Sequence, residues 1–131
     1  MALLVLTLCT SATLKKGDKK KKDVPEQVEV YGFGFAASFV DTLAYYTQIQ
    51  KLDSAQLVDK RYLDQRYQYS YQLKEYLEGS LQKYDYVCMI FFSPNLKKLQ
   101  KDFDKLVNKY QKSGVGLKSI AATEFQFEKT E

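Results

Sequence analysis

The hydrophobic pattern of the chain changes at residue 28, where strict alternation begins. In VEVYGFGFAA, residues 28–37, large side chains such as Phe33 and Phe35 fall on one parity, and Val, Gly and Ala fall on the other. A period of two residues is that of a β-strand. Glycine weakens a strand unless another segment approaches it closely. We therefore expect a helix or a neighbouring backbone to lie against the face with Gly32 and Gly34.

The next segments predict a second strand and two helices. Residues 42–49 are rich in β-branched and aromatic side chains and favour a strand that forms a hairpin with the first. Asp53 or Ser54 is a candidate N-cap for a short helix over residues 55–63. Apolar side chains at helical spacing then predict a helix over residues 69–82.

The C-terminal part predicts a strand, a helix and a last strand. Residues 86–92 are apolar on both parities, which is typical of a strand buried on both faces at the centre of a sheet. Ser93 and Pro94 form a helix start, and an amphipathic helix follows that ends at Ser113 and Gly114. A final strand lies within residues 116–128.

The element order β-β-α-α-β-α-β predicts an α+β fold. We expect a two-layer domain with a small mixed sheet of about four strands and the helices on one face. This domain covers residues 28–131 of a chain of 131 residues, which is the length of a single domain.

The N-terminus predicts export. Residues 1–12, MALLVLTLCTSA, contain an apolar run too short to span a bilayer, and they fit an export signal whose basic start has been lost. Residues 13–27 are Lys-rich and polar, and we interpret them as a disordered linker. Leu6-Thr7-Leu8 before Cys9 resembles a bacterial lipoprotein box, although the residue before the Cys should be small. Acylation of Cys9 and release after Ala12 as a soluble protein both remain open.

The charge belongs to this linker rather than to the domain. The formal net charge is +4, from 20 basic and 16 acidic residues. Residues 13–27 hold six Lys and three acidic residues, which leaves 14 basic and 13 acidic groups for residues 28–131. A nucleic-acid-binding domain normally carries its positive charge on the folded surface, so the nearly neutral domain argues against nucleic acid as a partner.

The composition excludes several kinds of chemistry. With no His and two Cys, the chain lacks Ser-His-Asp or Cys-His machinery, an imidazole metal site and a Cys₄ zinc site. We predict no catalytic, cofactor-binding or metal-binding residues. The carboxylates show no pairing along the sequence; they are Asp41, Asp53, Asp59, Asp64 and Asp85.

Four further features have both a structural interpretation and a functional one. Gly32–Phe35 resembles the centre of an RNA-recognition motif, but the context fails, and we expect Phe33 and Phe35 to pack in the core. Cys88 is interpreted as an inert core thiol. Lysines at four-residue intervals from Lys97 to Lys109 are interpreted as a solvated helix face with local ion pairs. A candidate interaction surface comes from a cluster of tyrosines, of which we select Tyr62, Tyr67, Tyr69 and Tyr71.

Three segments carry a family resemblance: GFAASFVDTLAYYTQIQKLDSA, YSYQLKEYLEG and CMIFFSPNLKKLQKDFDKLVNKYQ. They resemble an uncharacterised family of small exported bacterial proteins, over about residues 30–127. The resemblance implies export and an α+β domain, and it brings no activity, ligand or site residue.

The leading hypothesis is a non-enzymatic binding or structural domain of the cell envelope, periplasmic or associated with the outer envelope. Its expected partner is an envelope protein or a glycan, with no cofactor and no nucleic acid, and with membrane contact only through an acylated Cys9. The alternative is a carboxylate- or tyrosine-dependent envelope hydrolase or its accessory domain. A nucleic-acid binder that uses the Gly32–Phe35 strand ranks third.

Overall fold

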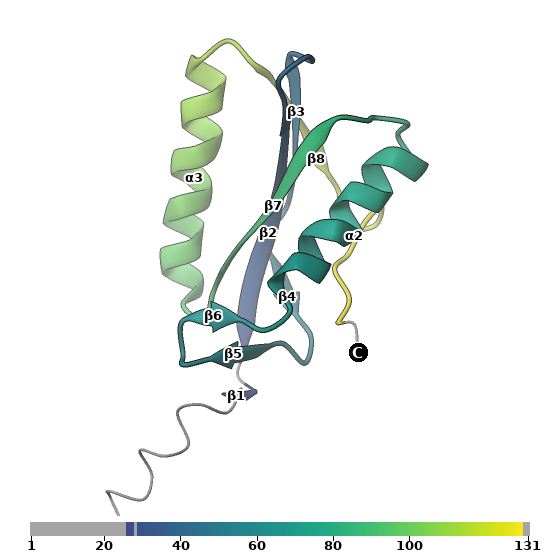
Figure 1. Cartoon of the computed structure of the whole chain (residues 1–131). Helices are drawn as coiled ribbons and strands as arrows, with labels where there is room; N and C mark the ends of the chain where they lie inside the picture. The colour runs from purple at the N-terminus through teal and green to yellow at the C-terminus, as the bar shows by residue number, and fades with distance from the viewer. Residues whose placement is uncertain (1–25, 28, 130–131) are drawn as a thin grey trace, which may run out of the picture.

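A mixed sheet of five strands forms the centre of the molecule. The structure is a computed structural model that describes residues 26–27 and 29–129. The longest strands, β2 (Val30–Ser38) and β7 (Tyr86–Ser93), pair antiparallel. On its other side β2 pairs antiparallel with β3 (Leu43–Thr47) and β4 (Gln50–Leu52), and β8 (Gly116–Ile120) pairs parallel with β3 (Figure 1). The predicted α+β fold with a mixed sheet is confirmed.

The central strand is β2, and β7 lies at an edge. Strand β7 pairs with β2 along its whole length, and no other described strand pairs with it. Val87 and Met89 of β7 are 51% and 38% exposed. The prediction that residues 86–92 form the central strand is therefore wrong. Apolar side chains on both parities show that both faces of a strand are apolar, but they do not show how many neighbours it has.

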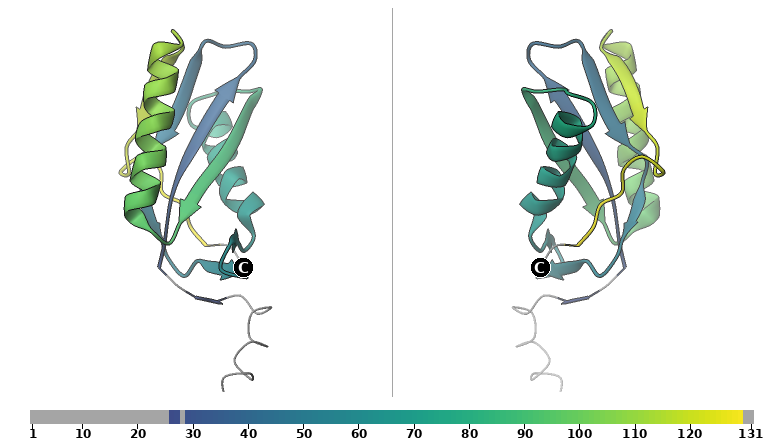
Figure 2. Two further views of the ribbon diagram at one scale, coloured as in Figure 1. Left: turned by 90° about the vertical axis from the view of Figure 1, so that its left-hand side faces the viewer. Right: turned by 90° about the vertical axis from the view of Figure 1, so that its right-hand side faces the viewer.

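The two helices of the described residues cover opposite faces of the sheet. Figure 2 shows α2 (Arg66–Gly79) beside β7 on one face and α3 (Leu96–Lys112) on the other. Phe33 packs edge-on against Phe103 of α3, with ring centroids 5.0 Å apart. A Cβ atom on the neighbouring Gly34 would lie 2.8 Å from Leu73 of α2. The prediction of a two-layer domain with its helices on one face is wrong, because each of the two faces of β2 receives a helix.

The close packing of other segments against β2 explains its two glycines. The sequence predicted that a helix or backbone lies against the face with Gly32 and Gly34. Gly34 faces Leu73 and Phe127, and a Cβ atom on Gly32 would lie 3.1 Å from the backbone oxygen of Phe91. This prediction is confirmed, since both positions leave little room for a side chain.

A bulge separates β3 from β4. Phe35 pairs with Tyr46 and Gly32 pairs with Gln50, so three residues of the second strand lie opposite two residues of β2. The fully buried Thr47 compensates for the interrupted ladder: its Oγ1 accepts from the backbone N–H of Gly34 at 2.8 Å. Strands β3 and β4 thus form one bent strand along β2.

The predicted short helix over residues 55–63 is wrong. These residues form β5 (Gln56–Val58) and β6 (Tyr62–Leu63), and β5 also pairs with β1 (Glu26–Gln27). Asp59 and Lys60 both have positive φ angles, of 58° and 57°, and the Arg61 N–H donates to the Val58 carbonyl at 3.1 Å. Two successive positive φ angles are typical of a type I′ hairpin turn. The sequence did not indicate this turn, because neither residue is Gly or Asn.

Other boundaries shift by a few residues. The predicted helix start at Ser93 and Pro94 is wrong, because Ser93 ends β7 and α3 starts after Asn95, whose side chain accepts from the backbone N–H of Lys98. The helix ends at Ser113 as predicted. The last strand ends at Ile120, and Phe125 and Phe127 then pack against Tyr76 and Tyr69 of α2.

Two of the predicted segments lie outside the described residues. They are the export signal in residues 1–12, including Cys9, and nearly all of the linker in residues 13–27. Neither described helix combines the length and the apolar character that crossing a bilayer requires.

Candidate functional site

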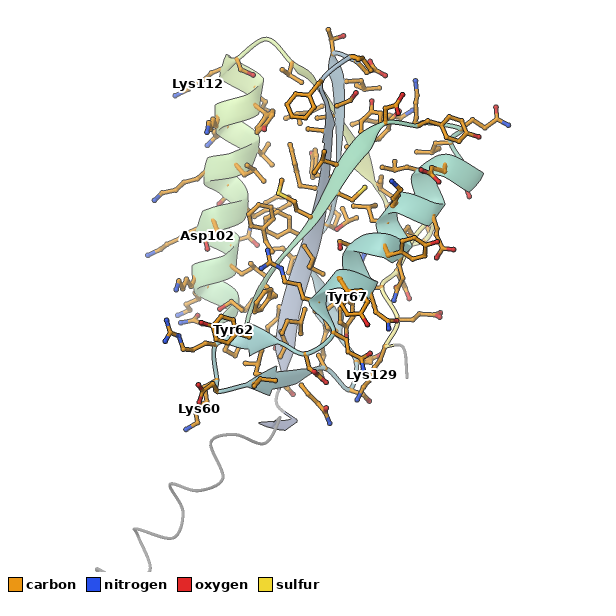
Figure 3. The ribbon with its side chains drawn as sticks, viewed as in Figure 1. Lys60, Tyr62, Tyr67, Asp102, Lys112 and Lys129 are labelled. Carbon is orange, nitrogen blue, oxygen red and sulfur yellow. The ribbon has the colours of Figure 1, made fainter. Side chains whose placement is uncertain are left out.

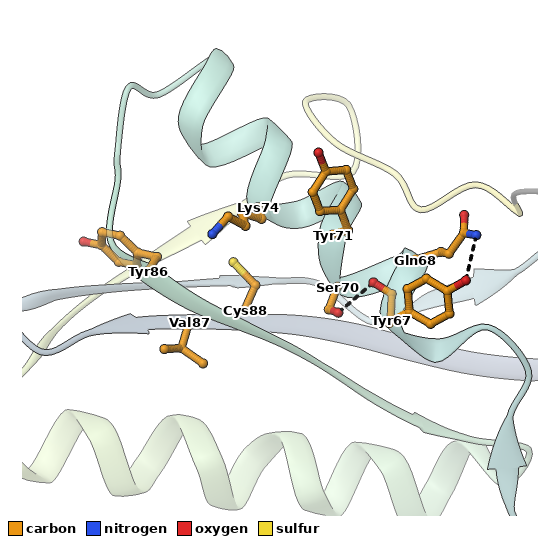
Figure 4. A pocket seen from close by; sticks show the side chains of 8 residues that line it. All are labelled: Tyr67, Gln68, Ser70, Tyr71, Lys74, Tyr86, Val87 and Cys88. Carbon is orange, nitrogen blue, oxygen red and sulfur yellow. Dashed lines mark hydrogen bonds between the residues drawn. The ribbon is translucent and has the colours of Figure 1, made fainter.

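A groove runs between α2 and the free edge of β7. It has a volume of about 720 Å³. Helix α2 lines it with side chains at positions i, i+3, i+4 and i+7, which form one stripe of a helix. They are Tyr67, Ser70, Tyr71 and Lys74, joined by Gln68, and β7 contributes Tyr86, Val87 and Cys88 (Figure 4).

The groove continues toward the start of α2. An adjoining hollow of about 570 Å³ is lined by Asp64, Gln65 and Arg66 together with Met89 and Ile90. Tyr67, Ser70 and Cys88 border both parts. The two parts therefore form one channel beside β7, and Cys88 lies at its middle.

The structure divides the four predicted tyrosines. Tyr67 and Tyr71 are 69% and 57% exposed and lie one helical turn apart in the groove, whereas Tyr69 is 3% exposed and packs against Phe127. Tyr62 is exposed on β6, where the Arg61 guanidinium lies 5.7 Å from its ring centre (Figure 3). The helical period separates Tyr69 from Tyr67 and Tyr71, so this signal was present in the sequence.

Cys88 lines the groove instead of lying in the core. Figure 4 shows its sulfur directed toward α2, while the neighbouring Val87 points to the opposite face of the sheet. The side chain is half-buried, and burial raises the pKa of its thiol to about 11. The interpretation as a core residue holds only in part, because the side chain packs against the core but also lines the groove. The expectation of an inert thiol agrees with the raised pKa.

Alkylation of Cys88 should be slow at neutral pH. Its pKa is raised from the ordinary 9.0 to about 11, so the folded thiol holds about a hundredfold less thiolate at pH 8 than the unfolded one. We expect the iodoacetamide rate of a Cys9→Ser chain to fall accordingly relative to the same chain in urea. The rate should rise about tenfold per pH unit toward pH 11. Equal folded and unfolded rates at pH 8 would contradict the assignment.

Tyr86 fixes the start of β7 to the β2–β3 loop. Its hydroxyl lies 3.0 Å from Asp41 Oδ2 and 2.6 Å from the Leu43 carbonyl oxygen, and Lys83 Nζ lies 3.7 Å from the same carboxylate. The hydrogen bond from Tyr86, followed by one from the Leu43 backbone, lowers the pKa of Asp41. Burial and the nearby carboxylate raise the pKa of Tyr86. Each group is thus held in its usual protonation state at neutral pH, which suits an anchor and not an acid–base pair.

The remaining carboxylates lie on separate segments. Asp53 follows β4, Asp59 lies in the β5–β6 turn, Asp64 follows β6 and Asp85 precedes β7. Within the described residues no cluster of three or more Asp, Glu, Cys or His side chains has the arrangement of a metal site.

The structure tests the predictions made for the Phe33–Phe35 aromatics and for the lysines of α3. Phe33 and Phe35 are buried against Phe103 and Tyr110 of α3, which confirms that they pack in the core and removes them as a stacking platform. The α3 lysines form an exposed face, but the ion pairs of the described residues lie elsewhere: Lys51–Glu29, Lys74–Glu78 and Lys83–Asp41.

The two edges of the main sheet differ in chemistry. Strand β8, at one edge, carries exposed Lys118 and Ser119. Strand β7, at the other, reads YVCMIFFS and contains neither a charged residue nor a proline. Proteins normally protect edge strands with charges, prolines or bulges, because an open edge accepts further strands. Edge β8 has such protection and edge β7 does not.

Comparison with family models, with curated proteins and with solved structures finds no match for this chain. The assignment of a function therefore depends on the chemistry of the groove and of the edge of β7.

Proposed function

We propose that the protein is a non-enzymatic binding domain, exported to the bacterial cell envelope, that binds an extended polypeptide segment as an additional strand on β7. The observation that carries this proposal is the uncharged outer edge of β7 beside a groove lined by Tyr67 and Tyr71. Backbone N–H and C=O groups on a free edge supply hydrogen bonds to an added strand, and flanking side chains select its residues. This chemistry favours a protein partner over a glycan.

The surroundings of β7 specify the segment that it would accept. Alternate side chains of an added strand point to opposite faces. On the α2 face they meet the rings of Tyr67 and Tyr71, and on the other face they meet the exposed Val87 and Met89. A segment that is apolar on both parities fits both surroundings.

A peptide selection tests this function. Phage-displayed random peptides are selected on the full chain, immobilised at low density so that neighbouring copies do not meet. We expect apolar peptides whose affinity falls at least about tenfold with Val87→Lys, because an edge lysine blocks pairing. N-methylation of the peptide should abolish binding at every second residue and be tolerated between them, since only alternate N–H groups face β7.

The control is Val40→Lys, which places the same charge at an exposed residue in the β2–β3 loop. It should leave the affinity unchanged. The proposal fails if no peptide is selected, if Val87→Lys binds as well as the unchanged chain, or if N-methylation lacks the two-residue period.

A further inference from the structure

We propose that the strand added to β7 is β7 of a second copy of the chain, paired antiparallel about a twofold axis beside Cys88. This inference rests on the proposed function, since it names the occupant of the same edge. Pairing of two β7 strands would join the two sheets into one continuous sheet, with both α2 helices on one face and both α3 helices on the other.

The composition of β7 favours a second copy. The surroundings of β7 favour an added strand that is apolar on both parities, and β7 itself has that composition. Its outer edge is also unpaired among the described strands. No charge on β7 opposes its own copy. On the α2 side of the groove, Lys74 is already paired with Glu78 of the same helix at 3.7 Å. At the other end of the groove the charged side chains, Asp64 and Arg66, are of opposite sign, and the Arg66 guanidinium lies 5.7 Å from the ring centre of Phe92. Self-pairing therefore brings no like charges of β7 itself together.

The alternation of side chains limits the register. Residues directly opposite each other in an antiparallel pair point to the same face. In a dimer with a twofold axis normal to the sheet, one residue must therefore lie opposite its own copy, because consecutive residues point to different faces. Cys88 borders both parts of the groove. With the axis at Cys88, Val87 lies opposite Met89 of the second copy. The two most exposed side chains of β7 would then cover each other.

The helices fit the same arrangement. Helix α2 contacts both β7 and β2, because Leu73 reaches Gly34 while Tyr71 borders the groove. The small Ser70 borders both parts of the groove, as Cys88 does, and would therefore lie near the axis.

Sedimentation velocity over a concentration series tests the dimer. The full chain with Cys9→Ser should form a reversible dimer, and adding Val87→Lys should weaken self-association at least about tenfold. Val87 is half-exposed, so circular dichroism should show that this variant still folds. The control Val40→Lys should dimerise like its parent. A chain that stays monomeric throughout the series, or a dimer that Val87→Lys does not weaken, overturns the inference.

Cross-linking tests the register. Opposed residues in an antiparallel pair have Cα atoms about 4.5–5.5 Å apart, within the range that a disulfide spans. At alkaline pH, where more of the Cys88 thiol is ionised, oxidised glutathione takes up the two electrons and two protons and should link Cys88 to Cys88. In a Cys88→Ser background, Met89→Cys alone should not link, but a mixture of Val87→Cys and Met89→Cys chains should. Efficient linking of Met89→Cys alone overturns the register.

The peptide selection distinguishes failure of the dimer from failure of strand addition at β7. A monomeric chain that still selects peptides, with the two-residue N-methylation period, refutes the dimer and retains strand addition at β7. A monomeric chain that selects none refutes both.

Discussion

Replacement of Phe33 by alanine should lower the free energy of unfolding by about 3–5 kcal/mol, the cost of truncating a buried phenylalanine. Phe33 is 1% exposed, its ring stacks on Phe91 of β7 at 5.0 Å, and Phe103 of α3 contacts it edge-on at 5.0 Å. The ring thus joins the central strand to the edge strand and to a helix, and its loss leaves a cavity between all three. Urea unfolding followed by circular dichroism measures the change.

The control for this variant is Phe39→Ala. Phe39 is 96% exposed in the loop after β2, and its truncation should change the free energy of unfolding by less than about 0.5 kcal/mol. Equal effects of the two substitutions would contradict the placement of Phe33 between the sheet and α3.

Introduction of valine at Gly34 should destabilise the fold by about 3 kcal/mol, at the upper end of the usual cost of overpacking. A Cβ atom there would lie 2.8 Å from Leu73 Cδ2 and 2.9 Å from Phe127 Cζ, and both side chains are buried. Relief of the clash requires α2 or the C-terminal segment to move away from the sheet. We expect urea unfolding at a lower midpoint.

Gly79 provides the matched control, because nothing lies within 4 Å of a Cβ atom built on this last residue of α2. Gly79→Val should leave the stability within about 1 kcal/mol of the unchanged chain, since valine is a better helix former than glycine. A Gly34 variant as stable as the Gly79 variant would show that α2 does not pack on β2 at this position.

The alternation in residues 28–37 was sufficient to predict both the strand and the packing at its glycines. Tyr31, Phe33 and Phe35 share a parity, and steric exclusion at Gly34 requires a close neighbour whatever that neighbour is. The pattern did not identify the neighbour. Leu73 comes from a helix, and Phe127 comes from the C-terminal segment. Contacts between residues distant in sequence leave no local periodic signal.

The candidate site was predicted only in part. Tyr67 and Tyr71 were selected on composition, and helical spacing places them together, whereas Tyr69 belongs to the buried stripe. Cys88 and Val87 were assigned to a central strand, because apolar side chains on both parities normally mean burial. Their place in a groove depends on β7 having only one neighbour among the described strands.

The sequence by itself determined the local features of this protein: an alternating strand with glycines on one face, a helix with a buried stripe, an amphipathic helix, and a composition without histidine that excludes several catalytic mechanisms. The tertiary structure decided the order of strands, the placement of one helix on each face and the position of β7 at an edge. Periodicity reports which sides of an element are apolar, because that property is fixed residue by residue. Which element covers each side depends on long-range pairing, and the proposed binding edge is a consequence of that pairing.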